Sequence, residues 1–299
     1  MERLEKCLQS IGYYRLSGYL YSYREKVRGE DGQWSVNDSF RAGTDFDVIW
    51  KRYLFDRRLR FLIMDAIERV EIAFRVAIAY EWAQSSGVSN PQQFRYNYAV
   101  KYRKLTQEKR LEAFQKNYSS SREDCAYHFR ERKNIASVGD LPIWVMVQFS
   151  TFGNLHHLYE GGIPLEVRKK IALSFGFSDE SFFSSIMALL NQARNVCAHH
   201  GRIWNKKWKR RAGGQRVVDI VQDCKSAPWN LLPKDSTAFL LMSLHVLLEK
   251  IAETSHWDER LEQLLKTNPP VLSIDREMGF PKAWRHQKLW SPLIASSKG

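Results

Sequence analysis

Residues 55–75 read FDRRLRFLIMDAIERVEIAFR, and this stretch decides the fold because its apolar residues recur in steps of three and four. The residues that follow this spacing are Leu59, Leu62, Ile63, Ala66, Ile67, Val70, Phe74, Ala77 and Ile78. A period of this kind places one apolar stripe along one face of an α-helix. We therefore predict a long amphipathic helix that starts near Thr44, with Asp47 completing a capping-box-like start, and ends near Gln84.

Other segments carry shorter helical patterns. Helices are predicted over residues 1–10, 106–118, 121–134, 164–175, 178–193, 236–254 and 257–266, and from Pro142 with an interruption at Gly153. Residues 26–43 are polar and rich in glycine, so we expect a loop there, and no strand alternation stands out. The predicted class is all-α, as one helical unit over 1–299. Its core is expected at about 44–85 and 140–255, with an exposed accessory segment at 86–139 and a docked, irregular C-terminal tail at 256–299.

The charge and the cysteines limit the functional classes. The formal net charge is +13, from 46 Lys and Arg against 33 Asp and Glu, and such a field favours anionic partners, most often nucleic acid. The four cysteines are far apart, which argues against a disulfide scaffold and fits a reducing cytoplasm. The N-terminus has no secretory signal pattern, and the most apolar run, residues 238–248, is too short to span a bilayer. We expect a cytoplasmic protein with no membrane contact.

Residues 194–205 read RNVCAHHGRIWN and follow directly on the helix predicted from residue 178. Cleavage of RNA without a metal requires a proton acceptor, a proton donor and cations that stabilise a charged phosphorane. Histidine exchanges protons near neutral pH, and arginine offers a fixed fork of donors to phosphate oxygens. We therefore identify Arg194, Asn195 and His199 as candidate catalytic residues, with His199 as general acid/base, Arg194 as phosphate clamp and Asn195 holding a ring or a phosphate by hydrogen bonds.

The spacing of these residues leaves several arrangements open. On an ideal helix Arg194 and His199 differ by about 140° in rotation and roughly 7.5 Å in rise, so they do not share a face. The last turn could loosen before Gly201, the Arg194 side chain could sweep round, or two copies of the chain could pool their motifs across a two-fold axis. The structural alternative is that a cation near a helix C-terminus is simply favourable electrostatics.

A basic run, residues 202–216, follows with no acidic residue and with Trp204 and Trp208 interleaved. Cations and aromatic rings in one segment are typical of single-stranded nucleic-acid binding, although both tryptophans could equally anchor the loop in the core. The candidate RNA-binding residues are His200, Arg202, Trp204, Lys206, Lys207, Lys209, Arg210 and Arg211.

Three further features receive structural interpretations. His156 and His157 could join Cys197, His199 and His200 in a metal site, but no regular ligand spacing is present, so we predict polar packing, no metal and no cofactor. The arginines of 57–60, beside Asp56, are interpreted as a solvated helix face. Glu71 and Arg75 have the spacing of ordinary helix-surface pairing.

Five segments together resemble the successive blocks of the Abi-like (abortive-infection) family, which is itself similar to the wider HEPN superfamily of helical ribonucleases. They are IGYYRLSGYLYSYR (11–24), FDRRLRFLIMDAIERVEIAFR (55–75), LPIW with FSTFGNLHHLY (141–159), RNVCAHHGRIWN (194–205) and MGFPKAW (278–284). The resemblance implies a HEPN-like helical bundle with extra N-terminal helices, formed by the core segments given above. It also implies an Arg-x4-His element, here Arg194 and His199, that cleaves RNA without a metal in a homodimer whose two motifs face each other.

In biological terms the resemblance implies an anti-phage or toxin-like endoribonuclease, with RNA as substrate and a cognate small non-coding RNA as a further partner. The competing hypothesis is a non-catalytic or latent RNA-binding protein that holds a structured small RNA. A third is a protein-interaction module whose positive charge serves solubility.

Overall fold

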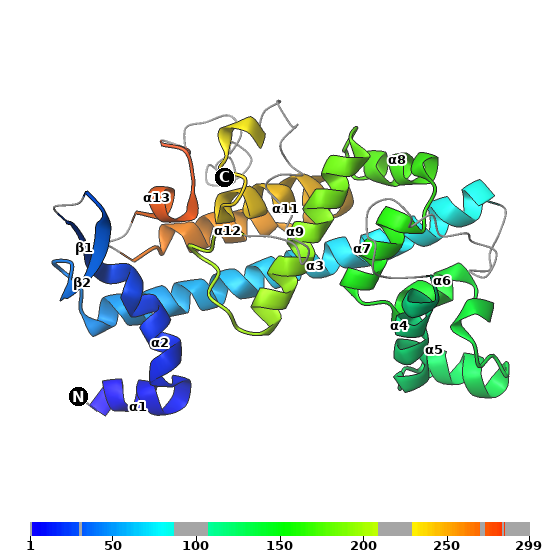
Figure 1. Cartoon of the computed structure of the whole chain (residues 1–299), viewed down its shortest axis with the longest axis horizontal. Helices are drawn as coiled ribbons and strands as arrows, with labels where there is room; N and C mark the ends of the chain where they lie inside the picture. The colour runs from blue at the N-terminus through cyan, green and yellow to red at the C-terminus, as the bar shows by residue number, and fades with distance from the viewer. Residues whose placement is uncertain are drawn as a thin grey trace.

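One helix runs the length of the protein. The computed structural model describes residues 2–29, 32–86, 107–208, 229–269, 273–282 and 284. Helix α3, Phe46–Ser86, lies along the long axis, and helices from both the N-terminal and the C-terminal part of the chain pack against it (Figure 1). The predicted apolar stripe is its buried face, with Leu59, Ile63, Ala66, Val70 and Phe74 fully buried. The long helix and the all-α class are therefore confirmed.

Asp45, rather than Thr44, caps the start of α3. The backbone N–H of Val48 donates to Asp45 Oδ1 at 2.8 Å, which is the bond that an N-cap side chain accepts from the third helical residue. The predicted start was thus one residue early.

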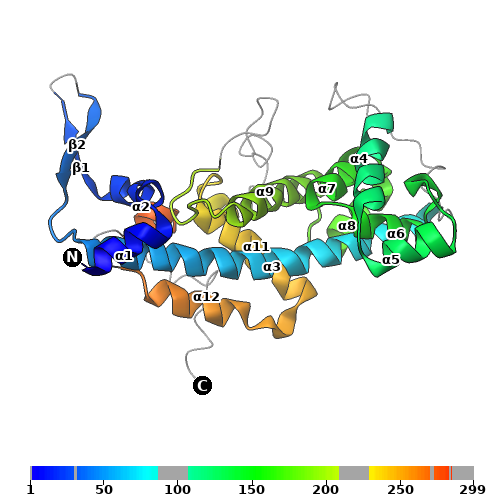
Figure 2. The same cartoon turned by 90° about the horizontal axis from the view of Figure 1, so that it is seen from below.

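The helices that carry the C-terminal half of the core lie against α3 on different sides. These are α7 (Phe152–Gly161), α8 (Leu165–Ser174), α9 (Glu180–Ala198), α11 (Thr237–Ile251) and α12 (Trp257–Lys266). Helices α7 and α9 lie on one side of α3 and α12 on the opposite side (Figure 2). Trp257 fixes α12 by donating from its indole N–H to the Leu62 carbonyl at 2.8 Å. No helix in the described ranges has the length and apolarity that a membrane span requires.

A group of shorter helices covers the far end of α3. It consists of α4 (Gln107–Ser120), α5 (Asp124–Tyr127), a π turn (His128–Arg132), a 3-10 turn (Val138–Asp140), α6 (Ile143–Met146) and a 3-10 turn (Val147–Phe149). The expectation that the predicted helices of this accessory segment are exposed is wrong in part, because Phe114, Tyr118 and Ala126 are buried in the common core. The division of the chain into core, accessory and tail segments stays a prediction.

The predicted break at Gly153 lies earlier, at Ser150 and Thr151. Thr151 caps α7 by accepting the Asn154 N–H at 3.2 Å. Gly153 sits in the first turn of α7, where a Cβ would come within 3.2 Å of the Asn191 side chain on α9. The glycine therefore permits close packing of the two helices and does not end one.

The N-terminal segment is helical and then forms a β-hairpin. Helices α1 (Glu2–Ile11) and α2 (Tyr13–Leu20) and a 3-10 turn (Tyr21–Tyr23) precede strands β1 (Arg24–Arg28) and β2 (Trp34–Phe40), which pair antiparallel. The expected loop at 26–43 is thus wrong over most of its length. Both strands are largely exposed, and their apolar alternation is weak: β1 has none, and in β2 the alternate apolar residues Trp34, Val36 and Phe40 are interrupted by Asp38.

The described part of the C-terminal segment is docked on the body, as predicted. Helix α13 (Ile274–Met278) ends at Gly279, whose φ of +82° lies in the left-handed region. A Cβ at Gly279 would come within 2.5 Å of the Ser236 Cβ, at the N-cap of α11. Phe280 and Trp284 are buried next to this contact, with ring centroids 4.6 Å apart.

Candidate functional site at the end of α9

Helix α9 is fixed at its start by a capping aspartate and along its length by burial. Asp179, one residue after the predicted cap Ser178, accepts the N–H groups of Ser181 and Phe182 at 2.8 and 3.0 Å. The helix then buries an almost continuous apolar face that includes Phe183, Ile186 and Leu190. The last turns of α9 therefore project from a rigid base.

The C-terminus of α9 is a Schellman motif with a histidine in the left-handed position. The Gly201 N–H donates to the Val196 carbonyl at 2.8 Å, and the His200 N–H donates to the Cys197 carbonyl at 2.9 Å. His200 has φ +57°, a conformation that glycine usually occupies at this place. Gly201 is needed for a different reason, since a Cβ there would lie 2.9 Å from Val196 Cγ1.

The three candidate catalytic residues surround this helix end. Asn195 and His199 are exposed and Arg194 is half-buried. The Arg194 guanidinium donates to Asn195 Oδ1 at 3.2 Å. The His199 ring makes no hydrogen bond or ion pair with any residue that the structure describes, so it is open to a ligand.

The last turn of α9 is not loosened before Gly201. The His199 N–H still donates to the Asn195 carbonyl at 3.0 Å, so the helical pattern continues to the C-cap. Unwinding of this turn therefore does not bring Arg194 and His199 to one phosphate. The two remaining arrangements are a sweep of the Arg194 side chain and the pooling of two motifs from two copies.

A buried carboxylate anchors the chain immediately after the helix end. Asp56 of α3 accepts four hydrogen bonds: from the Tyr19 hydroxyl at 2.6 Å, from Arg60 at 2.5 Å, and from the N–H groups of Ile203 and Trp204 at 3.0 and 2.7 Å. The segments 11–24, 55–75 and 194–205 thus meet at one side chain. Asp56 and Arg60 are buried, which corrects the interpretation of Arg60 as part of a solvated face, whereas Arg57 and Arg58 are exposed as expected.

The carbonyl groups of the helix exit are also held. Arg15 on α2 donates to the His200 carbonyl at 3.1 Å, and Arg60 donates to the Gly201 carbonyl at 3.4 Å. Thr237 at the start of α11 donates to the Ile203 carbonyl at 2.8 Å. The backbone that carries His199 and His200 is therefore fixed from three helices.

Burial sets the proton affinities beneath the site. Loss of solvent raises the pKa of the Asp56 carboxyl, although the bond from Tyr19, the charge of Arg60 and the two backbone N–H groups lower it. Burial likewise raises the pKa of the Cys197 thiol to about 12. Cys197 is therefore a neutral thiol at neutral pH and does not act as a nucleophile.

The structure separates the predicted RNA-binding residues into two groups. Trp204 is 0% exposed and lies beneath the buried Arg52 guanidinium, 4.2 Å from the ring centroid, and Trp208 is also buried. The prediction of Trp204 as a surface residue for RNA is thus corrected, since a buried indole cannot stack on a base. Both tryptophans are the core anchors that the sequence left as the alternative.

The other members of the basic run differ in accessibility. Arg202 is half-buried and donates to the Gly18 carbonyl and to Ser22 Oγ, while Lys207 is exposed and pairs with Asp235 at 3.2 Å. Lys206 is half-buried beside Trp208, and His200 is exposed. Lys209, Arg210 and Arg211 lie outside the described residues.

The residues that sequence reasoning missed lie on the core face of α3. Arg52, Asp56 and Arg60 follow each other at i, i+4 spacing, in line with the apolar positions of the same stripe. A charged residue on a predicted buried stripe was the signal, because burial of a charge requires a partner. Arg75 is similar: it pairs with Glu71 as predicted, but it also donates to the carbonyls of Val147 and Ser150 at 3.1 and 2.8 Å.

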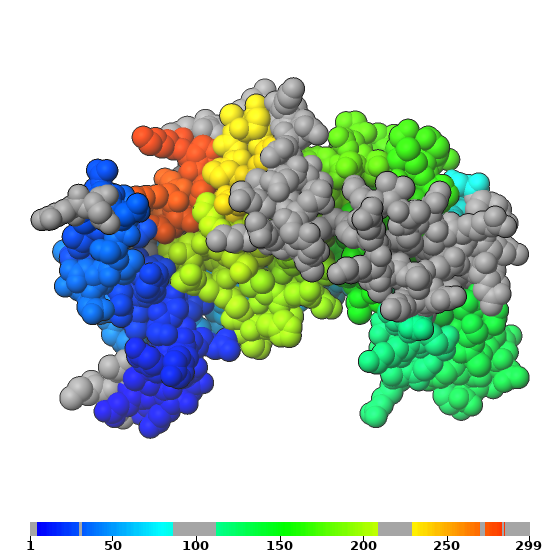
Figure 3. Space-filling view, in the orientation of Figure 1, coloured from blue at the N-terminus to red at the C-terminus, as the bar shows by residue number. Residues whose placement is uncertain are grey.

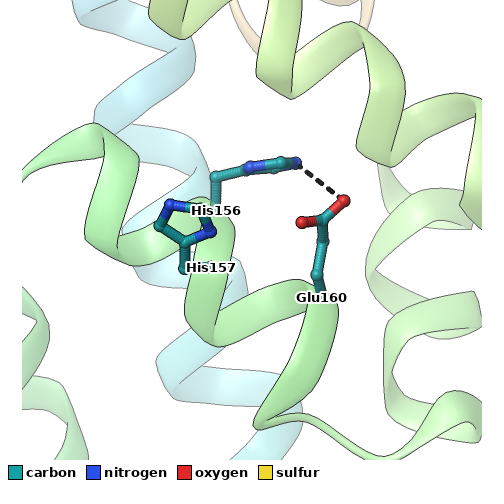
Figure 4. Close-up of side chains that lie close together, drawn as sticks. All are labelled: His156, His157 and Glu160. Atoms are coloured by element: carbon teal, nitrogen blue, oxygen red, sulfur yellow. Dashed lines mark ion pairs between the residues drawn. The ribbon is translucent and has the colours of Figure 1, made fainter. Parts of the chain in front are cut away.

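A second histidine group lies on α7, away from the end of α9. Ligand atoms of His156, His157 and Glu160 fall within 4.8 Å of one another, and the His156 ring points toward the Glu160 carboxylate (Figure 4). His156 Nε2 lies 2.9 Å from the Ser184 carbonyl, and Ser184 Oγ donates to Glu160 at 2.8 Å. Because a carbonyl only accepts, Nε2 carries a proton there, and the group is a hydrogen-bonded contact between α7 and α9. This agrees with the interpretation as polar packing.

The fold and the site define an all-α protein in which a helix end with a half-buried arginine, an exposed asparagine and an exposed histidine stands on a buried Asp–Arg–Tyr anchor. Residues 6–205 match the model of the Abi-like protein family, and the chain belongs to this family. The matched region ends at Asn205, at the end of the stretch that carries the candidate site. Neither a search of curated proteins nor a search of solved structures gave a match. Family membership indicates a function related to abortive infection.

Proposed function

We propose that the protein is an endoribonuclease of the HEPN type that acts in abortive infection and cleaves RNA without a metal. One observation carries this proposal: an exposed imidazole, an exposed amide and an accessible guanidinium stand together at a helix end whose backbone is held by Asp56, Arg60, Arg15 and Thr237. Catalytic groups are most effective on rigid elements that keep them in a fixed geometry.

The proposed reaction needs two proton transfers. His199 takes the proton from the RNA 2′-hydroxyl, the 2′-oxygen attacks phosphorus, and the 5′-oxygen leaves with a proton from an imidazolium. The products are a 2′,3′-cyclic phosphate and a 5′-hydroxyl. Arg194 stabilises the charge on the phosphorane, and Asn195 holds the Arg194 side chain in place. A second copy of the chain provides the second imidazole when the two motifs face each other in a homodimer.

The test is single-turnover cleavage of end-labelled RNA in excess EDTA. We expect products with cyclic phosphate ends, and a loss of rate of about 10²- to 10⁴-fold in His199→Ala, the range of general acid/base catalysis. His256→Ala is the matched control, because its ring is also exposed but belongs to the start of α12. Undiminished cleavage by His199→Ala rejects the proposal.

The second candidate function is an RNA-binding protein without catalysis, which holds a structured small RNA. It is favoured by the +13 net charge and by the absence of a direct bond between Arg194 and His199 among the described residues. The measurement is the nucleic acid that co-purifies with the protein. A defined small RNA together with no cleavage under any condition supports this function over the first.

A further inference from the structure

A groove lies between the β-hairpin and α13, at one end of the molecule. It has a volume of about 820 Å³. Its chemistry comes from Tyr21, Glu25, Lys26, Trp34, Arg41 and Arg276. The hairpin and α13 lie at the same end of the molecule in the space-filling view, where they are blue and orange-red (Figure 3).

The groove presents two aromatic rings to solvent. Trp34 is 67% exposed and Tyr21 is 59% exposed, although large aromatic side chains normally bury most of their surface. In the hairpin register Trp34 stands opposite Arg28, and Val36 opposite Lys26. Because side chains alternate along a strand, Trp34, Val36 and their two cationic partners share one face.

The charge of the groove is positive. Lys26, Arg41 and Arg276 stand against one carboxylate, Glu25. Lys26 and Arg276 are exposed, and neither forms an ion pair with a residue that the structure describes. The Arg41 Nε–H donates to the Arg24 carbonyl at 3.4 Å, which leaves the other N–H groups of its guanidinium available to a ligand. The groove therefore combines free cations with unburied rings.

The base of the hairpin is joined to the candidate site. Ser22, next to Tyr21, accepts hydrogen bonds from Arg202 and from Asn205, each at 3.3 Å. Arg202 also donates to the Gly18 carbonyl. Ser22 thus joins the exit of α9 to the segment that carries Tyr21, one of the residues that line the groove.

We propose that the groove between the hairpin and α13 binds a single-stranded segment of RNA, with a base stacked on Trp34 and phosphates held by Lys26, Arg41 and Arg276. Cations that follow a backbone and exposed rings that stack on bases are the two components of single-strand recognition. A duplex keeps its bases stacked on each other and cannot use Trp34 in this way. This inference rests on RNA being the ligand of the proposed function, and it adds a binding site outside the Arg194–His199 element.

The test is binding of a labelled single strand of about 12 nucleotides, a length typical of such sites, measured by fluorescence anisotropy. The strand is fully 2′-O-methylated, so it lacks the nucleophile and binding is separated from cleavage. We expect Trp34→Ala to weaken binding by about fivefold or more, the lower end for loss of one stacked base. Lys26→Ala/Arg276→Ala is expected to reduce the slope of log K against log salt by about 1.4, since each lost phosphate contact contributes roughly 0.7.

Matched variants lie at the opposite end of the molecule. Tyr127→Ala removes an exposed aromatic ring, and Arg132→Ala/Lys133→Ala removes the same charge from exposed positions. Both are expected to change binding by less than about twofold, as for neutral surface substitutions. Equal effects of the groove and control variants overturn the inference, as does an equal loss with an RNA duplex.

Cleavage of unmodified RNA is followed in parallel, so that the two proposals fail separately. A groove-dependent loss of binding without any cleavage supports the groove and rejects the nuclease. Cleavage that depends on His199, together with binding that is insensitive to the groove variants, supports the nuclease and overturns the groove.

Discussion

The stretch 194–205 divides into two halves with opposite environments. Asn195, His199 and His200 are exposed, whereas Ile203 and Trp204, only a few residues further on, are fully buried. The first half holds groups that can act on a ligand, and the second half holds the backbone by way of Asp56. Residues that can act on a ligand and residues that stabilise the fold thus lie next to each other in one short segment. Substitutions in the two halves should therefore have different effects on activity and on stability.

The buried half gives the largest expected effect. Asp56→Ala leaves the Arg60 guanidinium and two buried N–H groups without their acceptor, and loss of one partner of a buried ion pair typically costs about 3–5 kcal/mol. Urea denaturation measures the change in the free energy of unfolding. Glu166→Ala, which breaks the exposed pair with Lys169, is the control and is expected to cost less than about 1 kcal/mol. Similar losses in the two variants contradict the role of Asp56 as anchor.

The exposed half should show the reverse pattern. Arg194→Ala is expected to lower the single-turnover cleavage rate by about 10²- to 10³-fold, as for removal of one donor to a developing oxyanion. Its free energy of unfolding should stay within about 0.5 kcal/mol of the wild type, because the one hydrogen bond that the Arg194 side chain makes with a described residue is to the exposed Asn195. Arg194→Lys keeps the charge and loses the fork, so partial activity in that variant shows how much the geometry contributes. Equal stability losses in Arg194→Ala and Asp56→Ala would erase the division between the halves.

Substitutions of His200 and Gly201, at the junction between the halves, test the geometry of the helix end. His200→Gly removes a side chain from the left-handed region and is expected to raise the free energy of unfolding by up to about 1 kcal/mol. Gly201→Ala is the paired variant and is expected to be destabilising, because its Cβ meets Val196 Cγ1 at 2.9 Å and the Val196 carbonyl oxygen at 3.2 Å. Thermal unfolding of both variants measures the two changes in stability. A gain for Gly201→Ala and a loss for His200→Gly would mean that α9 ends differently.

A buried histidine elsewhere in the protein, His245, contrasts with the exposed His199. Its contribution to stability is the smallest of the effects predicted here. His245 on α11 lies 3.0 Å from both carboxylate oxygens of Asp258 on α12. Burial lowers the pKa of His245, but the hydrogen bond and charge of Asp258, with a contribution from Glu249, raise it above its usual value overall. The pair therefore stabilises the fold fully below the unfolded-state pKa of about 6.5, and this stabilisation is lost as the pH rises through the raised folded-state pKa.

The comparison of wild type with His245→Gln isolates this contribution. The difference in free energy of unfolding between the two proteins should be largest in mildly acidic solution and should decrease as the pH rises. Asp258→Asn should weaken the dependence, since it removes the larger of the two charges that raise the pKa of His245. A difference that grows with rising pH contradicts the assignment.

Much of the fold could be predicted, because the signals were local. The buried stripe from Leu59 to Ile78 could be predicted from the helical period alone, and the docked tail was indicated by Phe280 and Trp284. The hairpin was missed because β1 has no apolar alternation and that of β2 is interrupted by Asp38. The caps shifted by one residue, to Asp45 and Asp179, because neighbouring Thr44 and Ser178 are also favoured cap residues and the backbone geometry decides between them.

The candidate site was predictable in its residue types and not in its environment. The cation, amide and imidazole of Arg194, Asn195 and His199 were evident from the chain, and their roles in cleavage stay a prediction. The accessibility of Trp204 was not predictable, because a tryptophan in a basic run suits a surface and a core equally well. The Arg52 guanidinium that lies over its ring is far from it in the sequence.

The sequence by itself determined the helices, the positive charge and the reactive groups, since period, composition and side-chain chemistry are properties of the local chain. The tertiary structure alone decided which charges are buried and which are free. Asp56 becomes an anchor only when α2, α3 and the exit of α9 converge on it, and Lys26 and Trp34 form a groove only when the hairpin lies beside α13. Long-range contacts fix the dielectric environment of each group, and that environment separates a structural charge from one that can meet a ligand.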